Sequence, residues 1–403
     1  MKNSSIELPQ LTSEEATTLA RDLFGVAGHT RPLPSERDQN FLVETSNGAA
    51  FVLKIANASE VREVLEAQNA ALEYLARNEK TLRCPKVIVS KAGEHIPTAL
   101  AKAGTEHFVR LLSYVPGHLL VQTRPFSQSL LEGLGRFFGL LDRTFNDFSH
   151  PALQRTLEWD LRNASAVISE NLSHISDSHQ RALIESNLER FQKIAEPVFP
   201  TLRTSIIHND GNDYNILVTN VGPQGGKISG LIDFGDMIES HTIFELAICT
   251  AYAILDAADP MTAAAQVVSG YHQENPLTEL EVELLYDLIT MRLCTSVVMA
   301  ARQKKLYPDN AYLTVSEGPA GEALEHLTQV NPKLMHYAFR DACGWPPCPK
   351  TLQVIHWLEN HSDDIGAVIE PAIRSGDVIV FDRSPESSEF IDVPEPTDTK
   401  RAT

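Results

Sequence analysis

Two segments in the middle of the chain enclose polar side chains between apolar ones, and they limit the fold more than any other feature. The first, Ile206–Leu217, reads IIHNDGNDYNIL, and the second, Leu231–Met237, reads LIDFGDM. The apolar residues predict buried strands, so the polar groups must lie where those strands end. Polar groups at such positions are unfavourable unless they are paired or bind a metal ion. The two segments therefore predict a functional centre built from two neighbouring loops.

The spacing of the polar residues suits phosphoryl transfer. That reaction needs a carboxylate to receive the hydroxyl proton, oxygen ligands for Mg²⁺, and a cation on the nucleotide phosphates. Asp210 and Asn215 lie on one loop and Asp233 begins the second, and Asp and Asn oxygens are ligands that suit Mg²⁺. A single loop Asp is usually a turn or cap residue. The chemical role is favoured because the two spacings, HxDxxxxN and IDFGD, occur together inside apolar frames.

HNDGNDYN resembles the catalytic loop of the aminoglycoside phosphotransferase and choline kinase superfamily, and IDFGD resembles its metal-binding motif. The resemblance implies an α+β, protein-kinase-like bilobal fold. A small antiparallel β lobe with one helix would be followed by a larger, mainly helical lobe. It also implies Asp210 as the catalytic base, Asn215 and Asp233 as Mg²⁺ ligands, and ATP or GTP as the co-substrate. His208 is expected to brace the catalytic loop.

The hydropathy pattern agrees with two lobes. Before Gly117 it predicts helices from Thr12 to Leu23 and over Ser59–Asn78, with a hairpin turn at Ser46–Gly48. The predicted strands are 29–34, Asn40–Thr45, Ala49–Ile55, Pro85–Ser90 and Glu106–Tyr114. Later helices are predicted at 126–145, 151–171, 178–196, 241–257, 260–274, 277–305 and 317–330, with β structure at Ser205–Asn220 and Lys227–Phe234.

These patterns divide the chain into three parts. We expect a nucleotide-binding lobe over residues 1–112 and a catalytic and substrate-binding lobe over 113–345. The extension over 346–403 is expected to be partly disordered, because its end is polar and contains proline. One helix is expected within it, at Leu352–Glu359.

Lys54 in FVLKI occupies the strand position at which this superfamily carries its phosphate-binding lysine. Apolar neighbours and the helix that follows favour this role over a solvent-facing lysine on an alternating strand. We expect its ion-pair partner on that helix, with Glu66 as first choice and Glu63 as second.

Further nucleotide contacts are expected from two loops. Pro34–Asn40 stands where protein kinases carry a glycine-rich loop, but it contains no glycine. Phosphate contacts there would come from Ser35, Arg37 or backbone amides. The segment Leu111–Val115 is expected to pass the nucleotide base, with contacts from Ser113 and Val115.

Several segments resemble hydroxylysine kinases within the superfamily, over about residues 20–345: LPSERDQNF, VLKIAN followed by EAQN, DFGDM followed by FELAI, and MRLCTSVVMAAR. The resemblance implies a small hydroxylated amino acid or amino alcohol as the acceptor. A substrate carboxylate calls for an Arg fork, and an ammonium calls for acidic groups. Arg292, inside an apolar helical stretch, either pairs with a protein carboxylate or faces the substrate carboxylate. The candidates for an ammonium or hydroxyl are Asp213, Glu239, Glu245 and Asp160.

The composition limits the partners. A net charge of −19 argues against nucleic acid, since a phosphate backbone is bound by a basic surface. Five scattered cysteines without a CxxC pair suit reduced thiols, and we expect a cytoplasmic protein. No signal pattern or run of about 18 apolar residues is seen, so no membrane partner is expected. A homodimer is one oligomeric state that the sequence allows.

Other functions fit the same motifs. The acceptor could be an aminoglycoside-type antibiotic, choline or homoserine, because aromatic and acidic residues also bind organic cations. A nucleotide-binding pseudokinase is the non-enzymatic alternative. Intact Lys54, Asp210, Asn215 and Asp233 argue against it, because loss of activity usually removes such ligands.

Overall fold

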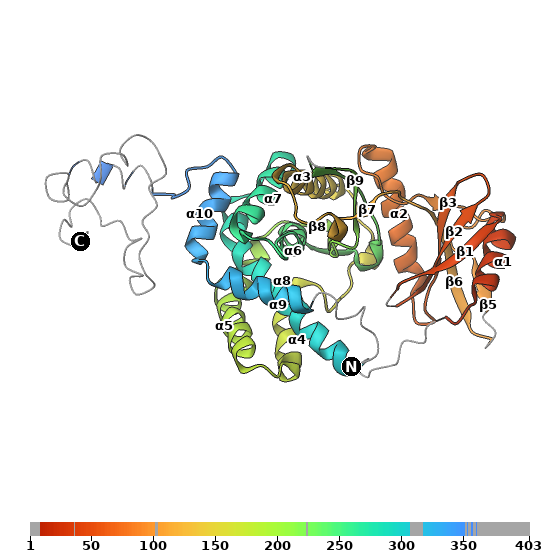
Figure 1. Ribbon diagram of the computed structural model, residues 1–403, viewed down its shortest axis with the longest axis horizontal. Coiled ribbons are helices and arrows are strands. Elements are labelled where there is room, and N and C mark those ends of the chain that lie inside the picture. The colour runs from red at the N-terminus through yellow and green to blue at the C-terminus, as the bar shows by residue number, and fades with distance from the viewer. Residues whose placement is uncertain are drawn as a thin grey trace.

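The computed structural model describes residues 9–35, 37–100, 104–222, 225–306 and 317–350, together with residues 353, 356, 357 and 360. Figure 1 shows a sheet with helices α1 and α2 at one end of the molecule and a larger, mainly helical lobe beside it. The predicted α+β bilobal fold is confirmed.

The smaller lobe is an antiparallel sheet in the order β1-β2-β3-β6-β4, with β5 also paired to β6. Its strands are β1 (Gly28–Leu33), β2 (Gln39–Thr45), β3 (Ala50–Ile55), β4 (Val87–Ile88), β5 (Thr98–Leu100) and β6 (Glu106–Ser113). Helix α1 (Ser13–Phe24) begins with a capping box, in which Thr12 and Glu15 each accept from the other's backbone N–H. Its Ala16 and Ala20 join Leu53 in one apolar cluster, so α1 covers one face of the sheet. Helix α2 (Arg62–Asn78) lies between the sheet and the larger lobe (Figure 1).

The larger lobe packs eight α-helices around a few short strands and turns within the described residues. The helices are α3 (Gln128–Phe145), α4 (Ala164–Asn171), α5 (Ser178–Ile194), α6 (Ile243–Ala253), α7 (Pro260–Glu274), α8 (Glu279–Leu306), α9 (Glu317–Thr328) and α10 (Pro332–Ala342). The strands are β7 (His118–Leu119), β8 (Thr204–Ile207), β9 (Ile216–Gly222), β10 (Gly225–Leu231) and β11 (Ile238–His241). The 3-10 turns are η1 (Leu120–Thr123), η2 (Pro151–Leu153), η3 (Leu161–Asn163), η4 (Leu172–His174), η5 (Glu196–Thr201) and η6 (Phe234–Asp236).

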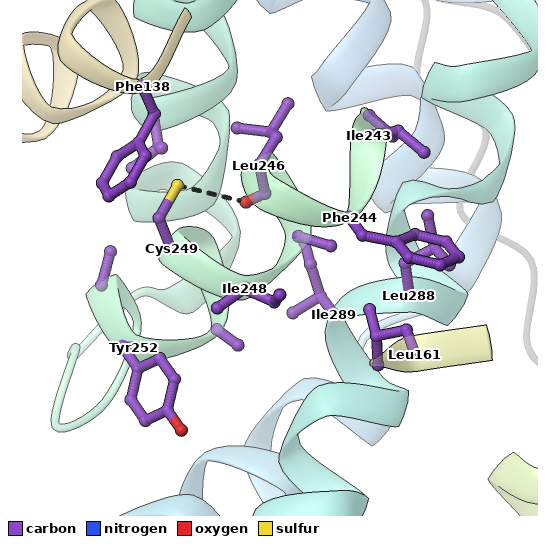
Figure 2. Packing of buried hydrophobic residues seen from close by; sticks show 14 of the residues in the cluster. Phe138, Leu161, Ile243, Phe244, Leu246, Ile248, Cys249, Tyr252, Leu288 and Ile289 are labelled. Carbon is purple, nitrogen blue, oxygen red and sulfur yellow. Dashed lines mark hydrogen bonds between the residues drawn. The ribbon is translucent and has the colours of Figure 1, made fainter. Parts of the chain in front are cut away.

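Helix α6 is the centre of this lobe, and all of its residues are buried. Figure 2 shows Phe244 of α6 beside Leu288 of α8, and Cys249 of α6 beside Phe138 of α3. The loop after β8 rests on this layer, because a Cβ at Gly211 would come within 2.7 Å of Phe138 and 3.3 Å of Cys249. The helical core therefore supports the first of the two polar loops from below.

Helix α8 is long and apolar enough to cross a membrane by length and composition, but its apolar window is entirely buried inside the protein. It contacts α4, α5, α6, α9 and α10, so it joins most of the helices of the larger lobe. The buried polar residues on it, including Arg292, are therefore held in place by the helices packed around α8.

Some predicted elements differ from the observed ones. The single helix expected over 151–171 is η2, η3 and the short α4. Asp160 accepts from the backbone N–H of Arg162, and Asn163 donates to the carbonyl of Leu157, so side chains compete with the helix for backbone groups. The helix expected from residue 241 begins at Ile243, because the preceding residues pair with β8 as β11. No sequence pattern predicted α10, β5, β7 or β11.

The smaller lobe also has two shorter elements than expected. Helix α2 begins at Arg62 rather than Ser59, because the Asn57 side chain accepts from both the N–H and the hydroxyl of Ser59 in a local turn. The strand expected over Pro85–Ser90 is reduced to β4. The helix expected at Leu352–Glu359 and the end of the chain over 384–403 lie largely outside the described residues.

Candidate active site

The two polar loops lie side by side because backbone bonds join them. The backbone N–H of Ile232 donates to the carbonyl of Asn215 over 2.9 Å. Asn209 and Asp233 both adopt positive φ, at 65° and 60°, a conformation that non-glycine residues rarely take. These turns place Asp210, Asn215 and Asp233 on the lining of one cavity.

His208 connects the same two loops. The backbone N–H of Asp210 donates to its Nδ1 over 3.3 Å, so Nε2 carries the ring proton and donates to the Ile232 carbonyl over 3.1 Å. Burial lowers the pKa of His208 to about 4, and the imidazole is therefore neutral. This arrangement fits the bracing role expected from the sequence.

Asp210 is held in one orientation by two amides. Its Oδ1 accepts from Asn212 Nδ2 over 2.8 Å, and its Oδ2 accepts from Asn215 Nδ2 over 2.7 Å. Burial, helped by the charge of Asp236, raises its pKa to about 7, while Arg292 acts in the opposite direction. The side chain is 26% exposed, so a substrate hydroxyl can reach it. A carboxylate with a pKa near neutrality is well matched to taking up a proton in catalysis.

Asn215 and Asp233 fit a divalent cation by their donor chemistry. The amide nitrogen of Asn215 is engaged with Asp210, which leaves its Oδ1 as a ligand. The charge of Lys54 lowers the pKa of Asp233 to about 2, so this half-exposed carboxylate is ionised. Among the described residues no group of three His, Cys, Asp or Glu side chains could hold a metal by itself. Two hard oxygen ligands on separate loops suit Mg²⁺, which usually shares its coordination with substrate phosphates and water.

The smaller lobe supplies cations to the same cavity. Lys54 Nζ lies 3.1 Å from Asp233 Oδ1, and Arg37 Nη2 lies 2.5 Å from Asp236 Oδ1. Ser35 also lines the cavity. Both ion pairs run from the sheet lobe to the second polar loop, so they join the lobes across the site.

The predicted ion pair between Lys54 and Glu66 is wrong. Glu66 is exposed and pairs with Arg62 over 3.4 Å, and Glu63 is exposed as well. The residues of α2 that line the cavity are Leu65 and Gln68. Glu66 is one position beyond Leu65, and each helical residue turns the side chain by about 100°, which points it away from the sheet.

Ser113 and Val115 do not line the cavity that contains Asp210. The Ser113 hydroxyl accepts from the backbone N–H of Lys86 over 2.8 Å. Val115 packs on β10, where a Cβ at Gly230 would come within 2.9 Å of its Cγ1. Their side chains are engaged in packing and capping, so a contact with the nucleotide base stays a prediction for their backbone.

Arg292 reaches the cavity from the middle of α8. Its guanidinium carbon lies 4.7 Å from the ring centre of Trp159 and 5.5 Å from that of Tyr252, and its Nη1 donates to the Trp159 carbonyl over 3.0 Å. Only 1% of the side chain is exposed, and its Nε has no hydrogen-bond partner among the described residues. Asp210 Oδ1 lies 3.6 Å from Nη2, beyond hydrogen-bond length. The guanidinium is therefore rigidly placed beside Asp210 with donors to spare.

The four acidic residues predicted as substrate contacts, Asp213, Glu239, Glu245 and Asp160, are not among the residues that line this cavity. Asp213 pairs with Arg124 over 2.8 Å, Asp160 with Arg162 over 2.6 Å, and Glu239 accepts from Gln154 over 3.0 Å. Each carboxylate thus serves a protein partner. Their assignment as contacts of an acceptor stays a prediction that the lining of this cavity does not support.

Residues 29–281 match the phosphotransferase enzyme family, APH. The chain belongs to this family. It is 32% identical to hydroxylysine kinase from Danio rerio over 334 residues, which cover 80% of this chain and 92% of that protein. The chain is thus a kinase of the APH family that phosphorylates a hydroxyl, with a nucleotide as co-substrate.

Two solved structures share the fold. Amicoumacin kinase hAmiN, in complex with AMP-PNP, Ca²⁺ and Ami, is 15% identical with a TM-score of 0.59, over 79% of this chain and 94% of that one. A microcompartment-associated aminopropanol kinase is 16% identical with a TM-score of 0.55, over 82% and 99%. At these identities they support the APH-family fold and no closer likeness.

Asn212, Arg110 and Tyr252 are among the cavity residues of this APH-family chain that the sequence analysis missed. Asn212 lies inside the HNDGNDYN loop and could have been found from the motif. Arg110 interrupts the apolar strand HFVRLLS, and the reasoning applied to Arg292 would have found it. Tyr252 stands in no motif, and only the packing of α6 against α8 brings it to the site.

Proposed function

We propose that this kinase transfers the γ-phosphate of a nucleotide to the hydroxyl of a small amino acid of the hydroxylysine type. The observation that carries the proposal is Arg292, a buried guanidinium beside Asp210 with unused hydrogen-bond donors. Its Nη2 lies 3.6 Å from Asp210 Oδ1 and 3.5 Å from the Tyr252 hydroxyl, and its Nη1 donates to the Trp159 carbonyl, so its Nε and remaining N–H groups are left for an anionic group of the substrate. The similarity to hydroxylysine kinases supports the same class of acceptor.

The aromatic residues of the site favour a carboxylate over a quaternary ammonium. Choline-type acceptors are recognised by aromatic faces that stack on the ligand cation. Here Trp159 and Tyr252 both face the guanidinium of Arg292. The two aromatic rings are thus occupied by a cation of the protein itself, Arg292. The site is therefore better suited to an anionic group of the substrate than to a quaternary ammonium.

The geometry supports the catalytic roles that we propose. Asp210, oriented by Asn212 and Asn215, would accept the proton of the acceptor hydroxyl as that oxygen attacks the γ-phosphate. When nucleotide binds, Lys54 would leave its ion pair with Asp233 and bind the nucleotide phosphates instead. A Mg²⁺ ion held by Asn215 and Asp233 would neutralise phosphate charge.

A coupled assay of nucleotide consumption tests the proposal. The acceptors are hydroxylysine, homoserine, threonine, choline, ethanolamine and an aminoglycoside, each with ATP and with GTP and Mg²⁺. We expect turnover with hydroxylated amino acids and none with choline or the aminoglycoside. Turnover confined to the aminoglycoside or to choline would contradict the proposed acceptor class, and nucleotide binding without turnover of any acceptor would favour a pseudokinase.

A further inference from the structure

Arg110 is a second buried cation in the sheet lobe, directly opposite Lys54. The register of β3 and β6 pairs these two residues, so their side chains share one face of the sheet. Both line the cavity that contains Asp210 and Asp233. Arg110 is only 4% exposed. Like charges directly opposite on neighbouring strands repel each other, so this pairing is unfavourable in the protein alone.

The hydrogen-bond partners of Arg110 are neutral. Its Nη1 donates to Asn69 Oδ1 over 3.2 Å, and its Nη2 donates to Gln68 Oε1 over 2.7 Å, both on α2. No carboxylate among the described residues lies within ion-pair distance of it. Asp233, which shares the cavity, is engaged with Lys54. The two amides thus fix the direction of the fork without neutralising its charge.

The cavity therefore presents two cations from adjacent strands, and of the acidic residues that line it only Asp233 forms an ion pair with one of these two cations, Lys54. Asp38, the next acid on this side, accepts from the backbone N–H of Asn57. A buried guanidinium without an ion-pair partner, next to a second cation, is stabilised when a polyanion enters. Arginine holds phosphate oxygens through two parallel donors, and a fork preset by amides loses little freedom on binding.

We propose that Arg110 is a phosphate-binding residue that contacts the nucleotide's phosphate chain together with Lys54, with Gln68 and Asn69 as its positioning residues. This inference rests on the proposed kinase function and adds a contact that neither the motifs nor the relatives assign. It also explains why α2 presents amides to the cavity: a glutamate there would neutralise the arginine.

A purely structural role makes a different prediction. If Arg110 only fastens α2 to the sheet, its loss weakens folding and affects all ligands of the site alike. If it binds phosphates, its loss affects ligands in proportion to their phosphate charge. A series of nucleotides that differ only in phosphate number separates the two roles.

The experiment measures dissociation constants of the full chain for adenosine, AMP, ADP and ATP with Mg²⁺ by calorimetry, or for the guanine series if the wild type prefers it. The variants are Arg110→Gln and Arg110→Lys. Arg77→Gln, on the exposed last turn of α2, is the control. For Arg110→Gln we expect weakening of about tenfold or more for ADP and ATP and less than about threefold for adenosine, as loss of a charged phosphate contact implies. Arg110→Lys keeps the charge and should lie between the wild type and Arg110→Gln.

Equal weakening for all four ligands, or none, would overturn the inference. If Arg110→Gln does not fold, Arg110→Lys decides alone, because loss of the fork should still weaken ADP more than adenosine. A wild type that binds no nucleotide would overturn the proposed function and this inference together. A wild type that binds and phosphorylates, with no phosphate-dependent loss in the variants, would overturn this inference only.

Discussion

At the scale of single residues, the proposed acceptor class rests on Arg292. Its guanidinium is fixed by Trp159 and Tyr252 and lies 3.6 Å from the oxygen of Asp210. This distance leaves it free to bind a carboxylate of the acceptor while the acceptor's hydroxyl approaches Asp210. This arrangement supports the proposed acceptor, which carries both groups.

Replacing Arg292 by lysine should discriminate between acceptors. We expect Arg292→Lys to raise KM for hydroxylysine by about tenfold or more, because a point charge cannot form the two parallel bonds of the fork. For the amino alcohol that corresponds to hydroxylysine without its carboxylate, KM should rise by less than about threefold. Steady-state kinetics with the two acceptors measure this directly. Equal losses would show that Arg292 acts only on Asp210 or on folding.

Glu245 gives a pH-dependent contribution to stability. It is fully buried on α6 and accepts from the backbone N–H of Asn209 over 3.0 Å. Burial raises its pKa to about 7, against an ordinary value of 4.5. The folded state therefore holds the proton more tightly than the unfolded state. The contribution is fully present below pH 4.5 and is lost as the pH rises to about 7.

Glu245→Gln should remove this dependence. Between pH 5 and 7 the wild-type free energy of unfolding should fall relative to the variant, by on the order of 1 kcal/mol per pH unit at most. Urea unfolding at a series of pH values measures it, with Glu185→Gln on the exposed face of α5 as the control. Parallel pH profiles for wild type and Glu245→Gln would contradict the assignment.

At the scale of elements, the contact between α3 and α7 depends on two glycines. A Cβ at Gly135 would overlap the Val267 carbonyl oxygen and come within 2.7 Å of the Tyr271 nitrogen, and a Cβ at Gly270 would overlap the Glu132 carbonyl oxygen. These helices share the most extensive contact between elements of the described chain, and α3 supports the loop of Asp210 through Phe138. Close helix packing therefore fixes the floor of the site.

Alanine at these glycines should separate packing from helix propensity. We expect Gly135→Ala and Gly270→Ala each to destabilise the fold by about 1–3 kcal/mol or more through overpacking. Gly133→Ala, on the same helix α3, meets only the Ile228 side chain at 4.0 Å and should be neutral or stabilising by up to about 1 kcal/mol. Thermal unfolding of the three variants tests this. A similar loss in all three would mean that the contact is not the cause.

Elements that are determined by neighbouring residues could be predicted from the sequence, and elements that depend on distant contacts could not. Helix α1 and the hairpin between β2 and β3 are set by neighbouring residues, and both were predicted. The pairing of β11 with β8 is formed by short, distant segments, and no local pattern marks it. Asp210, Asn215 and Asp233 could be proposed from the sequence because each lies in a short local motif. The ion pair between Lys54 and Glu66 was predicted wrongly because the sequence did not fix the rotation of α2 against the sheet.

At the scale of the whole molecule, the two lobes meet at ion pairs. Lys54 with Asp233 and Arg37 with Asp236 are the pairs in the cavity that link them, and nucleotide would enter between these groups. The boundaries expected at residues 112 and 345 stay predictions. The protein as a whole carries a net charge of −19, so the cations of the site lie within an acidic molecule.

This charge should be visible in the rate of nucleotide association. Because free ATP is also negatively charged, long-range repulsion slows its approach, and salt screens that repulsion. We expect the association rate constant for Mg²⁺-free nucleotide to rise as ionic strength increases from about 20 to about 150 mM. At the upper value the Debye length is only about 8 Å, so the repulsion between distant charges is largely screened. Adenosine, which is uncharged, is the control in stopped-flow measurements. A steep fall with salt would show that the local cations govern the encounter.

The most direct test of the account is the variant Asp210→Asn. We expect its turnover of hydroxylysine to fall by at least about a hundredfold, because the group that receives the hydroxyl proton is lost. Its nucleotide affinity should stay within about threefold of wild type, and Asp341→Asn on the exposed face of α10 should change neither quantity. Turnover of Asp210→Asn equal to that of the wild type would contradict the assignment of Asp210 as the catalytic base.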